Sequence, residues 1–335
     1  MNGAAAQPRA IAILGPTGAG KSELAMRIAR DLPVEIISVD SAQVYRGLDI
    51  GTAKPTPAER AAVPHHLIDI RDPEQVYSAG EFRADALRLM PQIAERGRVP
   101  LLVGGTMLYF RALFRGIADL PTADAALRAQ IDARAADIGW PALHAELTLL
   151  DPAAAARISP NDAQRIQRAL EVLHLSGKPL HTHWQAATEQ SASNATATTT
   201  TTPGWPGHWH IAKLEPASRE RLHQQLLTRL EQMVAAGLID EVRALLSKGT
   251  LNDHSPVMRL VGYRQFIAYC RGQQSRESAF QQALAATRQL AKRQLTWLRS
   301  ATILPEGVVA STIDAFDSQA RERLSTVLIQ ANTTS

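Results

Sequence analysis

The segment Gly15-Pro16-Thr17-Gly18-Ala19-Gly20-Lys21-Ser22 constrains the fold more than any other part of the chain. It has the phosphate-loop pattern, in which two glycines five residues apart are followed by Lys and Ser. The apolar run from Ala10 to Leu14 predicts a buried strand before it, and the apolar spacing from Glu23 to Leu32 predicts a helix after it. A strand, a glycine loop and a helix in this order favour a bound anion, because backbone N–H groups and the helix N-terminus both attract negative charge.

Two side chains of this loop are expected to bind the ligand or its metal ion. Lys21 would bind phosphate oxygens, and the hydroxyl of Ser22 would be a ligand of Mg²⁺. The pattern therefore predicts a phosphate or pyrophosphate ligand with a magnesium ion. It leaves the reaction open.

Strand patterns and helix patterns alternate along the first part of the chain. Residues 10–14, 34–39 and 99–103 are apolar or β-rich runs, and residues 78–94 have helical spacing. Alternation of this kind predicts an α/β fold of the P-loop nucleoside-triphosphate-hydrolase type, with a parallel sheet flanked by helices. Ligands of such sheets bind at the carboxyl ends of the strands. Asp40 and Thr106 follow two of these runs, so we expect both beside the phosphate loop.

A change in composition and in the expected secondary structure predicts a second domain. Ala-rich helical patterns without strands follow Gly116, and the low-complexity stretch from Gln185 to Gly204 predicts a flexible loop. We therefore expect a helical insertion domain over residues 118–205. Residues 1–117 and 206–335 would form the α/β core that contains the phosphate loop, with further helices near its C-terminal end. The tail from about Gly307 has no pattern from which we predict an element.

The bulk properties exclude several classes of protein. Cys270 is the only cysteine among 335 residues, which excludes an intrachain disulfide and a cysteine-based zinc site. No apolar run approaches the ~18 residues of a membrane span, so we expect a cytoplasmic protein without a membrane partner. We also expect a monomer. The net charge of +4 permits an anionic partner.

Three features allow two interpretations each. Asp40 could hold Mg²⁺ through water, as in nucleotide hydrolases, or take a proton from a nucleophile. Thr106 could act at a ligand or cap a helix over residues 107–114. In the helical pattern of residues 278–299, Arg288, Lys292 and Arg299 share one edge within roughly 40°. This edge suits either a phosphate backbone or a solvated helix face.

Seven stretches between about Ala10 and Arg299 resemble the tRNA dimethylallyltransferase family, also called tRNA isopentenyltransferases or IPP transferases. They are GPTGAGKS at Gly15, DSAQVYRGLDIGTAKP at Asp40, HHLID at His65, VGGTMLYFRAL at Val103, PNDAQRIQRALEV at Pro160, VGYRQ at Val261 and ATRQLAKRQLTWLR at Ala286. The phosphate loop is shared with many enzymes. The blocks at Asp40, Pro160 and Ala286 are far more specific.

The resemblance implies transfer of a dimethylallyl group from dimethylallyl diphosphate to N6 of adenosine 37 in tRNA, with release of pyrophosphate. It implies Asp40 as general base, Lys21 and Arg229 at the diphosphate, and Thr106 near the target nucleotide. The expected diphosphate-binding residues are Gly15, Pro16, Thr17, Gly18, Ala19, Gly20, Lys21, Ser22 and Arg229, with Mg²⁺ on Ser22.

The resemblance also implies tRNA contacts in both parts of the chain, and the basic pattern adds Met258, Arg259 and the helix of Arg288. The full expected set is Asp40, Ser41, Ala42, Gln43, Thr106, Arg128, Gln164, Arg165, Ile166, Gln167, Arg168, Met258, Arg259, Arg288, Lys292 and Arg293. The helical insertion is expected to close over the anticodon loop. Two other functions stay open: a small-molecule kinase with a phosphate loop, and an RNA-binding protein without catalysis.

Overall fold

The computed structural model describes residues 9–193, 204–205, 207–253, 255–300, 302–304 and 308–333. The chain forms two compact units, one of Met1–Arg115 with Thr199–Ser335 and one of Gly116–Thr198. We refer to them as the sheet unit and the helical unit. Residues 194–203, most of the predicted Ala/Thr-rich loop, lie outside the described residues.

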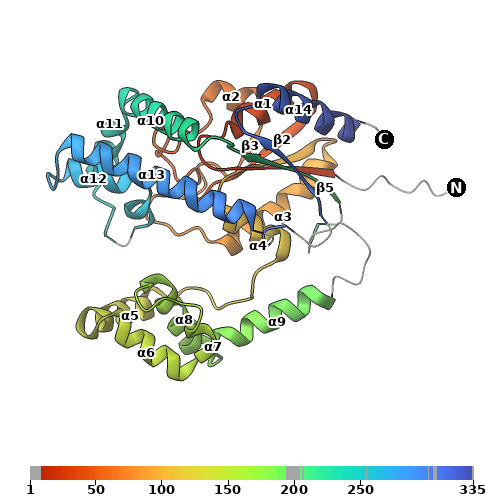
Figure 1. Ribbon diagram of the computed structural model, residues 1–335. Helices are drawn as coiled ribbons and strands as arrows, with labels where there is room; N and C mark the ends of the chain where they lie inside the picture. The colour runs from red at the N-terminus through yellow and green to blue at the C-terminus, as the bar shows by residue number, and fades with distance from the viewer. Residues whose placement is uncertain are drawn as a thin grey trace. The chain divides into compact units, whose positions relative to one another are not determined.

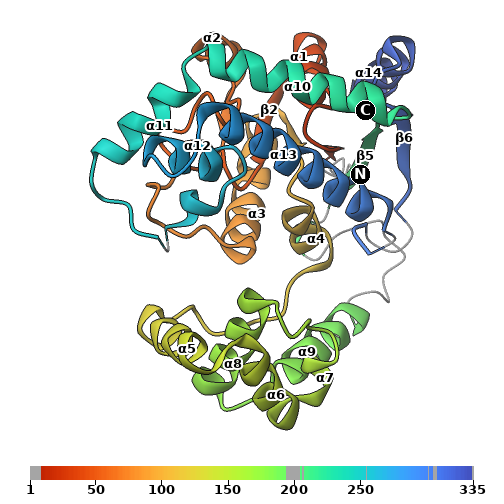
Figure 2. The ribbon, with the colours of Figure 1, turned by 60° about the vertical axis from the view of Figure 1, so that its left-hand side comes forward.

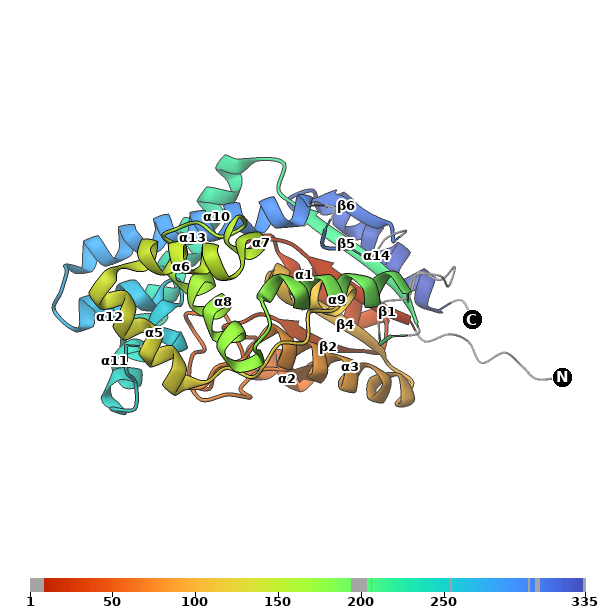
Figure 3. The same ribbon diagram turned by 90° about the horizontal axis from the view of Figure 1, so that it is seen from below.

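The sheet unit is built on six parallel strands, which confirms the predicted fold class. In the order of the sheet, β3-β2-β4-β1-β5-β6, β6 lies at the edge beside β5 (Figure 3). The strands are β1 (Arg9–Leu14), β2 (Val34–Val39), β3 (His65–His66), β4 (Val99–Gly104), β5 (His208–Glu215) and β6 (Ala310–Asp314). β1, β2 and β4 read as continuous apolar or β-branched runs because helices cover both of their faces.

Alternation along β1 divides the core into two layers. Ala10, Ala12 and Leu14 pack on one side of the sheet, and Ile11 and Ile13 pack on the other. The first side is covered by α3 (Ala79–Glu95) and α4 (Met107–Arg115), and the second by α1 (Lys21–Asp31) and α14 (Ser318–Thr333) (Figure 1).

A layer of helices follows β5. Its first two helices are separated at Gly237, whose φ of 103° ends the first and begins the second. The layer consists of α10 (Arg219–Ala235), α11 (Leu238–Ser247), the 3₁₀ turn η2 (Pro256–Arg259), α12 (Tyr263–Cys270) and α13 (Arg276–Arg299). The short helix α2 (Pro57–Ala62) lies earlier in the chain, between β2 and β3. α10 and α13 run side by side (Figure 2).

The described part of the helical unit has no strand. Its helices are α5 (Ala125–Ile138), α6 (Trp140–Leu150), α7 (Pro152–Ala155), α8 (Ala163–Ser176) and α9 (Leu180–Ser193). Ile131, Leu143 and Leu170 contribute to its own apolar core. The prediction of a flexible loop from Gln185 onward is wrong as far as Ser193, where α9 ends. Low complexity was the only ground for that loop, and the Ala and Gln of this stretch are good helix formers.

β6 and α14 form the tail in which the sequence predicted no element. β6 takes its hydrogen bonds from β5, with Ile211 opposite Ala310. α14 buries Leu324 and Leu328 against α1 and the sheet. Both elements depend on partners far away in the sequence, so local patterns did not reveal them.

Candidate active site

The phosphate loop joins the end of β1 to the start of α1. Gly18 and Gly20 have left-handed φ values of 80° and 71°, which turn the backbone into the N-terminus of α1. Within the described residues, the N–H groups of Gly18, Gly20, Lys21 and Ser22 donate no hydrogen bond to protein atoms. Four donors beside a helix N-terminus form a seat for an anion.

Lys21 lies across this loop. Its Nζ donates to the carbonyl oxygen of Pro16 at 2.7 Å. Desolvation in the loop and the nearby charge of Arg229 lower the pKa of Lys21 to about 8, and the charge of Asp40 opposes that shift. The three side chains therefore lie close enough for their charges to act on one another, although they are far apart in the sequence.

α10 supplies Arg229 to the site. A Cβ on Gly18 would lie 3.0 Å from Cδ2 of Leu226, so α10 packs closely on the loop. Arg229 follows Leu226 by three residues and lies on the same side of the helix. Burial lowers the pKa of Arg229, against the effect of Asp40. With one carboxylate, Asp40, beside two cations, the seat keeps a net positive charge that favours an anionic ligand.

Asp40 follows the last residue of β2. Its Oδ1 accepts hydrogen bonds from the backbone N–H of Ala42 at 2.8 Å and of Gln43 at 3.4 Å. Its Oδ2 accepts none within the described residues. One oxygen thus fixes the turn that follows β2, and the other is available to a ligand, either a proton or a hydrated metal ion.

Thr106 comes from the neighbouring strand end. Its Oγ1 accepts from the backbone N–H of Ser41 at 3.0 Å, so this side chain ties the ends of β4 and β2 together. The strand ends approach this closely only because residue 104 is Gly, where a Cβ would lie 2.0 Å from the carbonyl oxygen of Val39. The ends of β1, β2 and β4 meet at one edge of the sheet, as their order predicted.

Gln43 belongs to the framework of this turn. Its Oε1 accepts from Ser38 Oγ at 2.8 Å, and its Nε2 donates to the carbonyl oxygens of Thr52 and Ala53. The sequence predicted Gln43 as a tRNA contact. In this conformation, bonds to the protein engage its amide group.

Two polar residues that the sequence did not single out stabilise the same segment. The side chain of Lys54 is 1% exposed and binds the carboxylates of Asp49 at 2.7 Å and Asp69 at 2.5 Å. The carboxylate of Glu241, on α11, accepts the backbone N–H groups of residues 49, 50 and 51. Each charge is fully used within the fold, so we assign both residues to the support of the turn after Asp40.

Two further residues reach the phosphate loop from the C-terminal part of the chain. Arg321, on α14, donates to the carbonyl oxygen of Gly20 at 3.2 Å and forms an ion pair with Glu23 at 3.0 Å. Gln294, on α13, binds the loop at Thr17. Arg321 had no local signal, because a lone Arg on a helix is ordinary surface composition. Gln294 lies in the family-like block at Ala286, but no role was predicted for it.

The helical unit brings three predicted residues together, in a way the sequence did not anticipate. Arg128 and Arg168 both donate to the carboxylate of Glu171, which is completely buried. Gln167 donates to Asp132 at 2.6 Å. Both arginines are half-buried, so much of their charge is used inside the unit.

Ile166 does not fit its predicted role as a tRNA contact. Its side chain is 0% exposed within the core of the helical unit, because it lies on the apolar side of α8. Gln164 and Arg165, two residues on the polar side of the same helix, are exposed. α8 begins after Asp162, which caps it by accepting from the N–H of Arg165.

The predicted cations of α13 differ in environment. Lys292 and Arg293 are exposed, and Arg288 is half-buried near His223, whose pKa is lowered by burial first and then by Arg288. Arg299 donates to Glu215 at 2.5 Å. In η2, Arg259 is exposed and Met258 is partly buried. Lys292, Arg293 and Arg259 are therefore the predicted tRNA contacts that are most accessible in the sheet unit.

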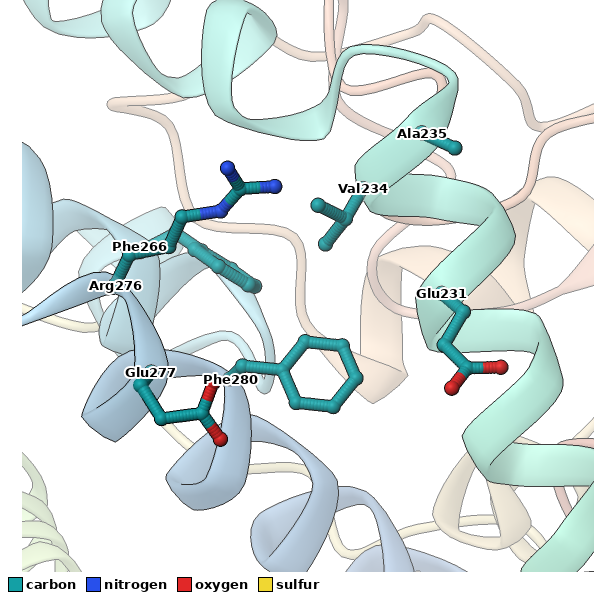
Figure 4. A pocket seen from close by; sticks show the side chains of 7 residues that line it. All are labelled: Glu231, Val234, Ala235, Phe266, Arg276, Glu277 and Phe280. Atoms are coloured by element: carbon teal, nitrogen blue, oxygen red, sulfur yellow. The ribbon is translucent and has the colours of Figure 1, made fainter.

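A cavity of about 590 Å³ lies elsewhere in the sheet unit, between α10, α12 and α13. Phe266, Phe280 and Val234 form its apolar wall, and the carboxylates of Glu231 and Glu277 lie at its sides (Figure 4). No predicted site residue lines it. Arg276 also lines it, so two carboxylates face one cation, and the cavity has no surplus of positive charge for a diphosphate.

Among the described residues, no helix is both long and apolar enough to cross a membrane. The same residues contain no cluster of three or more His, Cys, Asp and Glu side chains arranged for a metal ion.

Comparison with known proteins identifies the family. A family profile described as IPP transferase matches residues 43–301 of the chain. The chain belongs to this family. Two curated relatives, each named tRNA dimethylallyltransferase, come from Bordetella petrii and Bordetella pertussis. The first is 56% identical over 87% of this chain and 89% of its own length, and the second is 54% identical over 92% and 97%.

Solved structures of this family have the same fold. A tRNA isopentenylpyrophosphate transferase from Bacillus halodurans is 34% identical, with a TM-score of 0.62 over 98% of both chains. A eukaryotic dimethylallyltransferase, described as acting on tRNA, is 25% identical, with a TM-score of 0.75 over 97% of this chain and 80% of its own. The similarity thus extends over both units and beyond the range of the profile.

Proposed function

We propose that this IPP transferase transfers the dimethylallyl group of dimethylallyl diphosphate to N6 of adenosine 37 in tRNA. One observation carries the proposal. Asp40, a carboxylate with one oxygen that accepts no hydrogen bond within the described residues, lies within electrostatic range of Lys21 and Arg229 beside the seat of backbone N–H groups. The seat suits a diphosphate, and the carboxylate suits a nucleophile that must lose a proton. The names of the relatives support the choice of tRNA and of the prenyl donor.

The chemistry follows from this arrangement. The exocyclic amine of adenine is a weak nucleophile, because its lone pair is delocalised into the ring. Its nitrogen attacks C1 of the prenyl group, the bond from C1 to the diphosphate oxygen breaks, and Asp40 takes the proton from nitrogen. The N–H groups of the loop, Lys21 and Arg229 stabilise the charge that gathers on the departing pyrophosphate.

A divalent metal fits the residues present, and we propose Mg²⁺. Ser22 is an exposed residue in the first turn of α1, next to the anion seat. Mg²⁺ prefers oxygen ligands and is often held by a few protein groups together with substrate phosphates. When bound, it would neutralise part of the diphosphate charge.

We infer that both units contribute to tRNA binding. The target base must leave its stack to reach Asp40 and Thr106. The exposed cations Arg259, Lys292 and Arg293 would contact the phosphate backbone. We propose residues 1–117 and 206–335 as the catalytic core and residues 118–205 as an RNA-binding insertion, through Gln164 and Arg165 among others. We expect the enzyme to work in the cytoplasm, as a monomer.

The test is incubation of the protein with labelled dimethylallyl diphosphate, Mg²⁺ and unmodified tRNA, followed by nucleoside analysis. The proposal predicts labelled N6-dimethylallyladenosine, and none from a tRNA that has guanosine at position 37. Thermal protection by ATP but not by dimethylallyl diphosphate, together with ATP turnover, would indicate the kinase alternative instead. Binding of tRNA without any transfer would indicate an RNA-binding protein.

A further inference from the structure

Gln294 of α13 bonds to two strand ends at once. Its Oε1 accepts the backbone N–H of Thr17 at 2.9 Å, in the phosphate loop. Its Nε2 donates to the carbonyl oxygen of Gly105 at 2.9 Å, in the turn after β4. These bonds span 277 and 189 residues of sequence. One amide group therefore joins the diphosphate seat to the turn that carries Thr106.

The space around this amide admits little change. A Cβ on Gly105 would lie 2.6 Å from Nε2 of Gln294 and 3.1 Å from the carbonyl oxygen of Gly15. A side chain at position 105 would therefore displace either the amide or the loop. The glycine at this position allows the amide to lie between the two segments.

The bonds to Gln294 also determine which backbone N–H groups of the phosphate loop can bind an anion. Since the N–H of Thr17 points to Gln294, it is not offered to the anion seat, where Gly18, Gly20, Lys21 and Ser22 keep free N–H groups. On the other side, the bond to Gly105 orients the peptide directly before Thr106. Thr106 in turn accepts from the N–H of Ser41, next to Asp40.

We propose that Gln294 is a positioning residue, which sets the distance between the diphosphate seat and the Asp40–Thr106 pair. It touches neither substrate; its amide holds the two protein segments that do. This inference rests on the proposed function. It predicts that loss of the amide weakens donor binding and slows transfer, while the affinity for tRNA stays unchanged.

The experiment compares Gln294→Met with the wild-type enzyme. Met preserves the length and volume of the side chain and removes both hydrogen bonds. With two bonds lost, we expect the KM for dimethylallyl diphosphate to rise about tenfold and kcat to fall about tenfold. The Kd for tRNA, measured by fluorescence anisotropy, should stay within about twofold of wild type, since RNA contacts do not involve this amide.

Two further variants sharpen the test. Gln294→Glu keeps an acceptor for Thr17 but loses the donor for Gly105 and adds a negative charge near the diphosphate, so its donor KM should exceed that of Gln294→Met. Gln281→Met is the matched control, because Gln281 is an exposed glutamine of the same helix that bonds only to Glu277 among the described residues. It should match wild type in every assay.

The outcomes separate this inference from the proposed function. If the wild-type enzyme yields no labelled nucleoside, the function fails. If the wild type is active and both Gln294 variants keep its donor KM and kcat, the positioning role is overturned. A raised tRNA Kd with an unchanged donor KM would also overturn it, in favour of direct RNA contact. If Gln294→Met is unfolded by circular dichroism, the test rests on Gln294→Glu, with the same criteria.

Discussion

Asp40 and Glu171 are both carboxylates flanked by two cations, yet their surroundings differ in one decisive way. Glu171 is completely buried, and both of its oxygens accept hydrogen bonds from Arg128 or Arg168. Asp40 is partly exposed, and only one of its oxygens is bound within the described residues, to backbone N–H groups. Lys21 and Arg229 act on it through their charge.

The difference separates a structural ion cluster from a site. In the helical unit the charges are satisfied by one another, so the cluster stabilises the packing of α5 on α8 and has little left for a ligand. At the phosphate loop, burial lowers the pKa of both Lys21 and Arg229, and the charge of Arg229 lowers that of Lys21 further. A buried cation with a lowered pKa is strongly stabilised when an anion binds beside it. The unsatisfied charges therefore point to function, and the satisfied ones point to stability.

The sharpest test of the comparison is Asp40→Asn. Asn keeps an acceptor for the N–H of Ala42, so the turn should survive. With the base removed, we expect kcat for prenyl transfer to fall by about 100-fold or more. Thermal unfolding and tRNA binding should be close to wild type. Unchanged transfer would exclude Asp40 as the base and would contradict the distinction drawn here.

Unlike Asp40→Asn, Glu171→Gln should lower the stability of the helical unit. Removal of this charge leaves two arginines without their partner, and we expect the helical unit to lose about 3 kcal/mol of stability. Hydrogen exchange measured by mass spectrometry can report this for α5 and α8 separately from the sheet. Glu146→Gln is the control, because the Glu146–Arg134 pair in the same unit is partly exposed and should contribute less than about 1 kcal/mol.

The contribution of Glu171 to stability should decrease at acidic pH. Burial would raise its pKa, but the bonds from Arg128 and Arg168 outweigh burial, and the pKa lies below the ordinary 4.5. Its contribution to stability is thus complete above pH 4.5 and is lost as pH falls through the lowered value. The difference in stability between wild type and Glu171→Gln should shrink over that acidic range. A constant difference would mean that the Glu171 charge does not cause it.

The pKa of Lys21, lowered first by burial and then by Arg229, should appear in the pH dependence of diphosphate binding. With a pKa of about 8 in the free protein, Lys21 is protonated below pH 8 and loses its charge above it. The affinity for pyrophosphate should therefore fall above pH 8, so that the Kd measured by calorimetry rises by up to about tenfold per pH unit. Lys21→Arg should remove this dependence, because arginine keeps its charge. The same slope in both proteins would assign the titration to another group.

The smallest expected effect concerns the exposed face of α13. Lys292→Ala should weaken tRNA binding a few-fold and lower the slope of log K against log salt by about 0.7 to 0.9. Arg299→Ala should change that slope less, because Arg299 is already paired with Glu215. Equal binding at low and high salt for the wild type would exclude this face as a phosphate contact.

The parts predicted correctly share a physical basis. The phosphate loop, the strands before Asp40 and Thr106, and the helix of α3 are specified by neighbouring residues: glycines that permit left-handed turns, β-branched runs, and Ser78 with Glu81 as a capping box. Because parallel strands end at one edge, local elements alone were enough to bring Asp40 and Thr106 to the loop.

The parts that were missed depend on distant partners. Ile166 was matched to an RNA-binding segment, but the packing of α8 directs it into the core. β6 needs β5, and α14 needs the face of α1. Gln294 and Arg321 reach the loop from positions about 280 to 300 residues away, and no spacing rule connects them to it.

By itself, the sequence determined an anion seat between a strand and a helix, the α/β class, and the resemblance that led to a prenyl transfer on tRNA. These follow from short-range geometry and from motifs. Only the tertiary structure decided which charges are consumed inside the protein, as at Glu171, and which are left for a ligand, as at Asp40, Lys21 and Arg229. Whether a charge finds a partner depends on contacts between segments far apart in the chain, and such contacts exist only after folding.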